Sequence, residues 1–219
     1  MPDAQTGDRA RILSSIRMAL GTASTPEAIA AEYAALPRTY TAHGNETQAA
    51  MLELLKDRLL EYDSGVYECT EDSIALRVAE ILAGRGKESM VVPAGIPATW
   101  LPGDVRFEIA DHFDAYQLDS SEGLLSGCTV AIAETGSIVL QNAAAQGPRK
   151  LSLVPDYHLC VVFASQVVAT VPEAFTRLSA TAALPTTFIS GPSATADIEM
   201  TRIKGVHGPR FLDVLIVTG

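Results

Sequence analysis

Apolar positions follow helical spacing in some parts of the chain and strand-like spacing in others. Ile12, Ile16 and Leu20 stand four residues apart, which is typical of one face of a helix. They predict a helix over residues 8–20. Residues 21–45 contain Gly, Pro, Thr and Asn without a clear period and predict a linker or extended arm.

Two further helices are predicted in the first half of the chain. The first begins near Asn45, because Asn45 and Gln48 can each satisfy a free amide of the first helical turn. The second covers residues 72–83, where apolar residues again have helical spacing. Short apolar segments predict strands at residues 66–69, 89–92 and 105–109.

The second half is richer in predicted strands. Segments 128–133 and 137–140 flank Glu134, Thr135 and Gly136, and this pattern predicts a tight hairpin. Further strands are expected at residues 158–164, 167–171, 186–190 and 211–218, with helices at 172–179 and 194–200.

Alternating strands and helices predict an α/β fold with a mostly parallel sheet flanked by helices. The hairpin makes the predicted sheet mixed. We expect residues 1–44 to form an N-terminal helix and extended arm. Residues 45–219 are expected to form the α/β domain.

The composition is that of a folded globular protein and limits the possible functions. Of 219 residues, 47% are hydrophobic and 19% are charged. The formal net charge of -10 disfavours nucleic-acid binding, which needs a basic surface. No apolar segment approaches the roughly 18 residues that span a membrane, and the N-terminus has no signal-peptide pattern. A cytoplasmic location is therefore expected.

Easily recognised cofactor and catalytic motifs are missing. Cys69, Cys128 and Cys160 include no C-x-x-C pair, and the histidines lack metal-ligand spacing. We expect no metal site and no cofactor bound by this chain. The phosphate-loop, dinucleotide and nucleophile-elbow patterns are also absent from the sequence.

The first candidate site is the predicted hairpin. Glu134 follows an apolar strand and would be partly desolvated there, which suits acid/base or nucleophilic chemistry. Thr135 and Gly136 would contact a ligand, since glycine allows close approach of the backbone. The alternative is an ordinary hairpin turn with an exposed Glu.

The second candidate is the start of the helix predicted at residues 194–200. Hydroxyls of Ser193 and Thr195, together with free amides at a helix start, favour an anion. Asp197 is a catalytic candidate in the same segment. The alternative is that Ser193 or Thr195 only caps the helix while Asp197 and Glu199 complement its dipole.

The third candidate is a basic loop at residues 201–210. The first 140 residues carry 10 Lys/Arg and 21 Asp/Glu, whereas the remainder carries 6 and 5, so cations are concentrated late in the chain. Arg202 could orient an anionic substrate, with His207 as acid or base. Lys150 belongs to a second basic Gly-Pro loop. Both loops could equally be surface loops whose cations form ordinary ion pairs.

Three stretches resemble the lactate-utilisation protein C family, whose shared unit is the LUD domain. They are AETGSIVL at 133–140, RKLSLVPDYHLCVV at 149–162 and GPSATADIEMTRIKGVHGPRFLDVLIV at 191–217. The resemblance covers roughly residues 45–219. The order of the three stretches makes it specific.

The resemblance implies a fold similar to the sugar-phosphate isomerase, CoA-transferase and formyltetrahydrofolate cyclo-ligase group. It also implies a role in oxidising L-lactate to pyruvate beside separate subunits that carry iron–sulfur clusters. We expect this chain to bind a small carboxylate or to organise those subunits. The candidate roles are ours: proton transfer by Glu134, His207 or Asp197, and substrate binding by Thr135, Gly136, Lys150, Ser193, Thr195 and Arg202.

Two other functions remain open from the sequence. The chain could be a free-standing enzyme like other members of that fold group, with Glu134 as a carboxylate nucleophile toward an acyl-CoA. It could also be a scaffold with a vestigial pocket. Fold analogy alone does not decide between them.

Overall fold

The computed structural model describes residues 3–21, 25–196, 202–205 and 207–219. The chain divides into two compact units, residues 1–40 and 41–219. The first contains helix α1 (Asp3–Leu20) and helix α2 (Pro26–Ala35). The extended arm expected at 21–45 is therefore wrong over α2. This helix forms because Thr25 accepts a hydrogen bond from the Ala28 amide at 3.2 Å and Pro26 suits its first turn.

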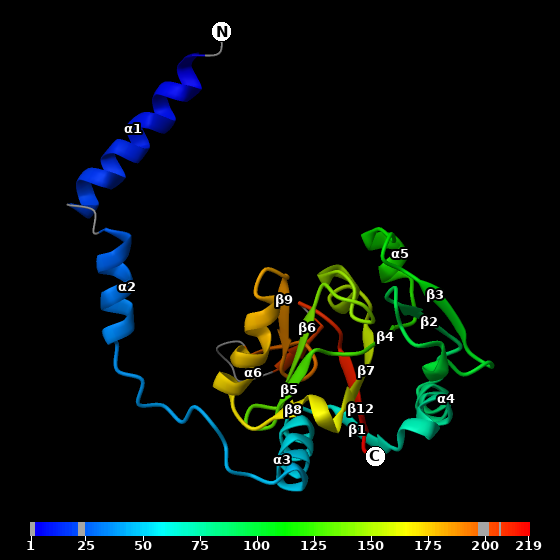
Figure 1. Ribbon diagram of the computed structural model, residues 1–219. Helices are drawn as coiled ribbons and strands as arrows, with labels where there is room; N and C mark the ends of the chain where they lie inside the picture. Colours follow the sequence, from blue (N-terminus) through cyan, green and yellow to red (C-terminus); the bar gives the residue numbers. More distant parts are fainter. Residues whose placement is uncertain (1–2, 22–24, 197–201, 206) are drawn as a thin grey trace. The chain divides into compact units, whose positions relative to one another are not determined.

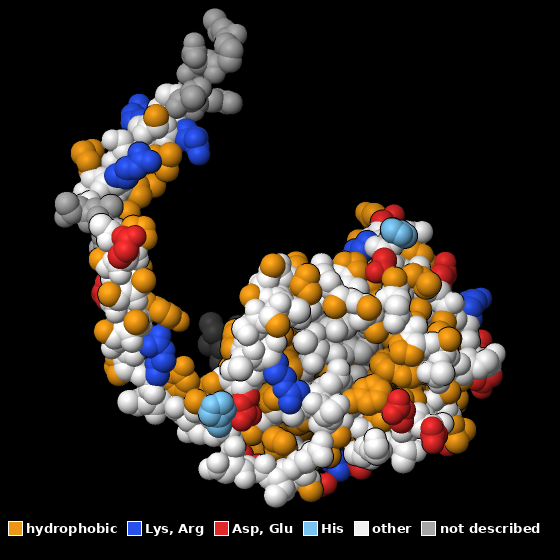
Figure 2. Space-filling view, viewed as in Figure 1, with side chains coloured by type: hydrophobic (Ala, Val, Ile, Leu, Met, Phe, Trp, Pro, Cys, Tyr) orange, Lys and Arg blue, Asp and Glu red, His pale blue; other side chains and the backbone are white. Residues whose placement is uncertain are grey.

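Both helices of the first unit carry exposed apolar side chains (Figure 2). Ile12 and Ile16 are exposed on α1, and Ile29 and Tyr33 are exposed on α2. No residue of α2 is buried. The helical spacing of Ile12, Ile16 and Leu20 therefore predicted the secondary structure of α1 correctly. No helix among the described residues is long and apolar enough to cross a membrane.

The second unit is built on a six-stranded parallel sheet (Figure 1). Its order is β1-β12-β7-β4-β2-β3, and every neighbouring pair is parallel. The strands are β1 (Gly65–Cys69), β2 (Ser89–Val92), β3 (Arg106–Ile109), β4 (Leu124–Ser126), β7 (Tyr157–Phe163) and β12 (Phe211–Val217). The predicted α/β fold with a parallel sheet is confirmed, and β4 is the strand that the sequence pattern missed.

The expected hairpin lies in a second, four-stranded sheet. Its order is β8-β5-β6-β9, with β5 and β6 antiparallel and β5 and β8 parallel. The strands are β5 (Val130–Ile132), β6 (Ser137–Gln141), β8 (Val167–Val168) and β9 (Thr186–Ile189). The hairpin was expected within one mixed sheet. It forms its own layer because both of its faces are apolar: Ile138 packs toward the first sheet and Val139 away from it.

Hydrophobic clusters define the order of the layers. Helix α4 (Ile74–Gly84) packs on one face of the parallel sheet, through residues such as Val78. Helix α3 (Gln48–Glu61) and the second sheet cover the opposite face, and α6 (Val171–Leu178) covers the far side of the second sheet. The remaining helices are α5 (Ala115–Asp119), η1 (Glu71–Ser73), η2 (Ala98–Trp100), η3 (Arg149–Ser152), η4 (Ala164–Gln166) and η5 (Ser179–Thr181).

The start of α3 differs from the expected cap. Thr47, with an extended backbone, accepts a hydrogen bond from the Ala50 amide at 3.3 Å, so the helix begins at Gln48. The predicted pairing of Asn45 with Gln48 at the helix start is wrong. The hydroxyl of Thr47 fills the capping position that the prediction assigned to Asn45.

The helix expected at residues 194–200 is also wrong over its described part. Ala194–Ala196 form strand β10, which pairs antiparallel with β11 (Arg202–Lys204). Ser193 anchors this hairpin, since its amide donates to the Pro209 carbonyl at 2.8 Å and its carbonyl accepts from the Gly205 amide at 3.0 Å. Cross-strand pairing replaces the helix start on which the anion site was argued.

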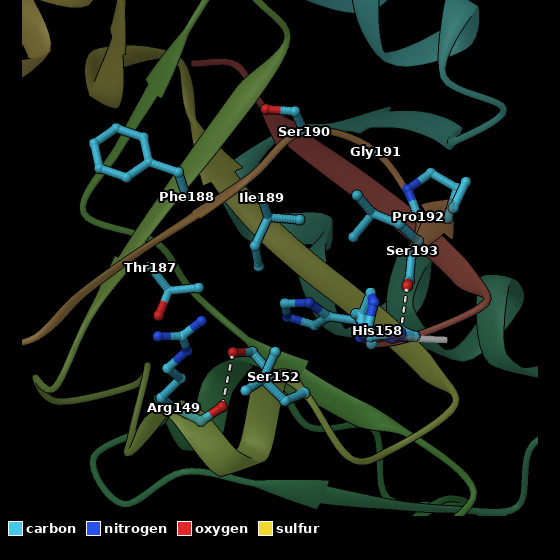
Figure 3. A pocket seen from close by; sticks show the side chains of 16 residues that line it. Arg149, Ser152, His158, Thr187, Phe188, Ile189, Ser190, Gly191, Pro192 and Ser193 are labelled. Atoms are coloured by element: carbon cyan, nitrogen blue, oxygen red, sulfur yellow. Dashed lines mark hydrogen bonds between the residues drawn. The ribbon is translucent and has the colours of Figure 1, made fainter. Parts of the chain in front are cut away.

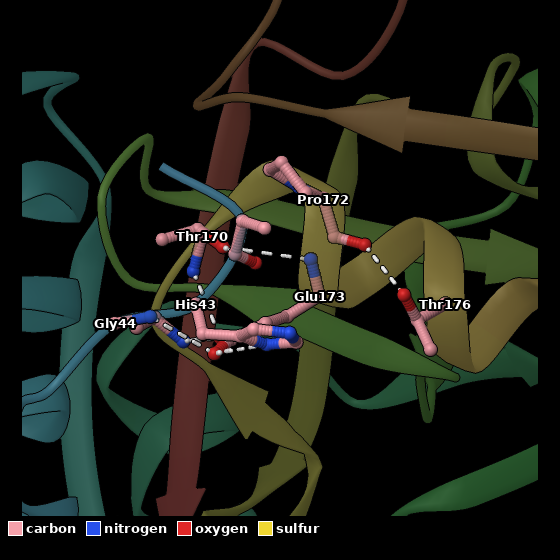
Figure 4. A network of polar contacts seen from close by, with 8 residues as sticks. His43, Gly44, Thr170, Pro172, Glu173 and Thr176 are labelled. Atoms are coloured by element: carbon pink, nitrogen blue, oxygen red, sulfur yellow. Dashed lines mark hydrogen bonds and ion pairs between the residues drawn. The ribbon is translucent and has the colours of Figure 1, made fainter. Parts of the chain in front are cut away.

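A polar clasp joins the beginning of the second unit to α6 (Figure 4). Glu173 accepts hydrogen bonds from the amides of Gly44 at 3.0 Å, Ala169 at 2.8 Å and Thr170 at 3.2 Å. His43 Nδ1 lies 3.7 Å from the same carboxylate. Burial opposes ionisation of Glu173, but the donated amides outweigh it and lower the pKa of the carboxyl. The clasp fixes the chain where it enters the domain.

We expect Glu173→Gln to lower the free energy of unfolding by about 1–2 kcal/mol, because the amide NH2 would face a backbone donor. Urea unfolding measures this change, and faster hydrogen exchange at the Gly44 amide localises it. Glu53→Gln is the control, since that side chain is 71% exposed and its loss should change stability by less than about 0.5 kcal/mol. Equal effects of the two variants would contradict a role of the clasp in stability.

Candidate functional site

A pocket of about 310 Å³ opens beside the amino ends of β7 and β12 (Figure 3). Helix η3 contributes Arg149 and Ser152, and β7 contributes His158. Strand β9 and the residues after it form a further wall, with Ser190 and Ser193 among them. The loop that contains His207 completes the lining. The pocket thus collects segments that are far apart in the sequence.

The charge of this pocket suits a small anion. Arg149 supplies a permanent positive charge, and no acidic side chain is found among the described residues that line it. Hydroxyls come from Ser152, Thr187, Ser190 and Ser193. Apolar side chains such as Leu153, Phe188, Ile189, Pro192 and Leu212 form the rest of the wall. One cation, several hydroxyls and an apolar wall are features that recognise a short carboxylic acid.

His158 is the most constrained polar side chain of the pocket. It is 0% exposed, and its Nε2 lies 2.8 Å from Ser126 Oγ. Its Nδ1 is buried and has no hydrogen-bond partner among the described residues. Burial lowers the pKa of this imidazole to about 4, so the ring is neutral at pH 7.

A second cavity of about 870 Å³ shares Arg149, Leu153, His207 and Gly208 with the pocket. Arg210 Nε donates to Asp156 Oδ1 at 2.6 Å, and this hydrogen bond lowers the pKa of the Asp156 carboxyl. The cation of Arg210 is therefore already neutralised. Arg149 is the cation that both cavities share.

The predicted hairpin site lies at the edge of the pocket. Glu134 is exposed and does not line it, so the desolvation expected for this carboxylate is absent. Thr135 Oγ1 donates to Ser137 Oγ at 2.8 Å, and Ser137 Oγ lies 2.7 Å from Ser190 Oγ. A chain of hydroxyls thus leads from the hairpin to the pocket wall.

Gly136 allows the turn of the hairpin to pack closely against α3. Its φ is 60°, and an added Cβ would lie 2.7 Å from Arg58 Cβ. Arg58 Nε also donates to the Glu134 carbonyl at 3.3 Å. The group that lies close to the Gly136 backbone is therefore Arg58 of α3, whereas the sequence analysis expected a ligand there.

Of the other candidates, Ser193 and His207 are brought together at the pocket. Ser193 Oγ accepts a hydrogen bond from the His207 amide at 3.1 Å. Lys150 does not line the pocket, since its Nζ donates to the Phe113 carbonyl at 2.6 Å. Asp197 lies outside the described residues, as do the side chains of Thr195 and Arg202.

Sequence reasoning singled out the basic loop 146–150 but named Lys150 instead of Arg149 as its site residue, and it missed His158. Arg149 and His158 both stand inside the stretch 149–162 that carried part of the family resemblance. A histidine in an otherwise apolar strand was the available signal, because a buried polar side chain needs a partner. Its spacing from other polar residues gave no indication of a site.

The fold and the pocket define an α/β protein with a small pocket between two sheets, lined by one arginine and several hydroxyls. Residues 38–217 match the LUD domain family. The chain belongs to this family, which confirms the resemblance found in the sequence.

Similar proteins support the same membership. "Lactate utilization protein C" of Deinococcus radiodurans is 40% identical over 174 residues, which cover 78% of this chain and 81% of that protein. "Lactate utilization protein C" of Macrococcus caseolyticus is 27% identical and covers 78% and 79%. The crystal structure of a DUF162 family protein from Deinococcus radiodurans is similar, with a TM-score of 0.69 and 36% identity, over 79% of this chain and 99% of that chain.

Proposed function

We propose that this protein acts in lactate utilisation as a subunit that binds a small carboxylate in the pocket beside β7 and β12. The observation that carries the proposal is the combination of Arg149 with a neutral, buried His158 in a pocket whose described lining has no acidic side chain. The relatives named for lactate utilisation support the substrate class.

In this proposal each part of the pocket has a distinct task. The Arg149 guanidinium pairs with the carboxylate, for which its planar fork of donors is suited. The hydroxyl of Ser193, whose oxygen accepts from the His207 amide, has its proton available to donate to a remaining oxygen. The apolar wall accommodates the methyl group of lactate. The pocket is larger than lactate alone requires, so water or a contribution from a partner chain fills the remainder.

The oxidation of lactate to pyruvate releases two electrons and two protons. In this proposal this chain binds the carboxylate, iron–sulfur clusters on partner subunits would accept the two electrons, and solvent water would take up the two protons. No group of three His, Cys, Asp or Glu side chains suited to a metal ion occurs within the described parts of the chain. The support for assigning carboxylate binding to this chain and electron acceptance to partner subunits is the family resemblance and the lining of the pocket.

Arg149→Gln is expected to weaken binding of L-lactate to the full chain at least about tenfold, because one charge-assisted pair is lost. Isothermal titration calorimetry measures the affinity. Arg106→Gln, which removes a cation from a different cavity, should leave it unchanged. Unaltered binding by the Arg149 variant would contradict the assigned role, and the absence of any binding would overturn the proposal.

Two variants distinguish this proposal from the other two functions: Glu134→Gln tests the acyl-CoA transferase and Arg149→Gln tests the scaffold. Glu134→Gln should bind L-lactate normally, because Glu134 is exposed outside the pocket. An acyl-CoA transferase that uses Glu134 would lose activity with this substitution. In host extracts that lack the chain, adding back Arg149→Gln should restore lactate-dependent dye reduction poorly. Full restoration would instead favour a scaffold with a vestigial pocket.

A further inference from the structure

We propose that His158 Nδ1 makes the pocket selective for an α-hydroxy acid over the corresponding α-keto acid, by accepting a hydrogen bond from the ligand hydroxyl. This inference rests on the proposed function and specifies which oxidation state of the substrate the pocket holds. Its basis is a hydrogen-bond network that fixes which ring nitrogen carries the proton.

The first step concerns the hydroxyl of Ser126. This group has one proton, and Ser126 Oγ donates it to the Gly127 carbonyl at 3.0 Å. We assign the donor of the 2.8 Å contact between Ser126 Oγ and His158 Nε2 to the ring, because the serine proton is then directed at the Gly127 carbonyl. Nε2 therefore carries a proton and Ser126 holds the ring in this tautomer.

The second step concerns the other ring nitrogen. Because the buried imidazole is neutral at pH 7, it has only one N–H, and Nδ1 is left with a lone pair. Nδ1 is buried without a hydrogen-bond partner among the described residues. An unpaired buried acceptor is unfavourable, so a ligand that donates to it gains affinity.

The third step compares the two acids. The α-hydroxyl of lactate can donate to Nδ1, whereas the α-carbonyl of pyruvate offers only lone pairs. Both acids present the same carboxylate to Arg149, which lines the same pocket. We assign the discrimination between them to His158, because its Nδ1 is the buried acceptor without a partner among the described residues. In Figure 3 His158 lies between Ser152 of η3 and Ile189 of β9.

Access to Nδ1 requires a local rearrangement. His158 borders the pocket but is 0% exposed, so other atoms of the protein cover Nδ1 in this structure. A hydroxy acid reaches this nitrogen only after those atoms move. Rotamer changes of this kind are common when ligands bind.

Calorimetric titration of the full chain with L-lactate and with pyruvate tests the inference. We expect L-lactate to bind at least about tenfold more tightly, which corresponds to one hydrogen bond made against one acceptor left unpaired. Ser126→Ala removes the contact that fixes the tautomer of His158 and should reduce this preference. Arg149→Gln should weaken the binding of both acids equally. Nitrogen-15 spectra of the free protein provide an independent measurement, with His158 Nδ1 expected in its unprotonated form.

The outcomes separate this inference from the proposed function. Equal affinity for the two acids, preference for pyruvate, or a protonated Nδ1 would overturn the role of His158 while carboxylate binding stands. Binding of neither acid would overturn both. Preference for L-lactate that Ser126→Ala reduces, with the fold intact by circular dichroism, would support both.

Discussion

Replacing Arg85 with Met is expected to lower the free energy of unfolding by about 3–5 kcal/mol, because it leaves a buried carboxylate without its cation. Asp213 on β12 is 0% exposed. Arg85, just after α4, donates from Nε to Asp213 Oδ2 at 2.8 Å and from Nη2 to Oδ1 at 2.5 Å. Tyr157 OH donates to Oδ2 at 2.9 Å.

The surroundings reinforce this ion pair. The Asp213 hydrogen bond raises the pKa of the Arg85 guanidinium. Burial, followed by the nearby charge of Asp213, raises the pKa of Tyr157, so its hydroxyl stays protonated and donates. Arg85 Cζ also lies 5.7 Å from the ring centroids of Tyr157 and Phe211. One substitution therefore disturbs several contacts.

Urea unfolding at pH 7 measures the loss. Arg77→Met, on α4, is the control, since its pair with Glu80 is partly exposed and should contribute less than about 1 kcal/mol. The double variant Arg85→Met/Asp213→Asn should recover most of the loss, because a neutral amide still accepts from Tyr157. A single variant Arg85→Met within about 1 kcal/mol of the native protein would contradict the buried-charge argument.

Lowering the pH from 7 to 5 is expected to reduce stability by about 2 kcal/mol through His158 alone. Its pKa is about 4 in the folded protein, whereas an unfolded histidine has a value near 6.5. Between these values the unfolded chain binds a proton that the folded chain does not. The stabilising contribution is therefore complete above about pH 6.5 and is lost as the pH falls toward 4.

Comparison with His158→Gln isolates this contribution. The stability difference between pH 7 and pH 5 should be about 2 kcal/mol smaller in the variant than in the native protein. His112→Gln, at an exposed site, should leave that difference unchanged. Carboxyls with lowered pKa, such as Glu122 and Asp156, affect native and variant proteins alike. Equal pH dependence of native protein and His158→Gln would show that the buried ring titrates normally.

Local patterns predicted most of the regular elements. The strand at Ser89–Val92 matches its prediction, and the hairpin around Glu134 has the expected antiparallel pairing. Alternation of apolar residues and a tight turn are encoded within about ten residues, so neighbouring positions suffice to reveal them. The wrong predictions lie where a capping or pairing partner determines the secondary structure. Thr25 caps α2, where a linker or extended arm was predicted, and pairing with β11 makes β10 a strand, where a helix was predicted.

The candidate site was only partly predictable. Ser193 and His207 were identified and do meet at the pocket, whereas Glu134 was favoured and lies exposed outside it. Lys150 was chosen over Arg149 in the basic loop 146–150, because nothing in the neighbouring sequence reveals which of the two side chains faces the pocket. Pocket residues come from η3, β7, β9 and the loop before β12, which only long-range packing brings together.

The sequence by itself determined the alternation of strands and helices and the membership of the LUD domain family, because periodicity and family motifs are properties of contiguous residues. The tertiary structure decided the separation into two sheets, the burial of His158 and its link to Ser126. Burial and hydrogen bonding depend on strands that are distant in sequence and adjacent in space. Those contacts set the protonation of the ring, and with it the chemistry that we assign to the pocket.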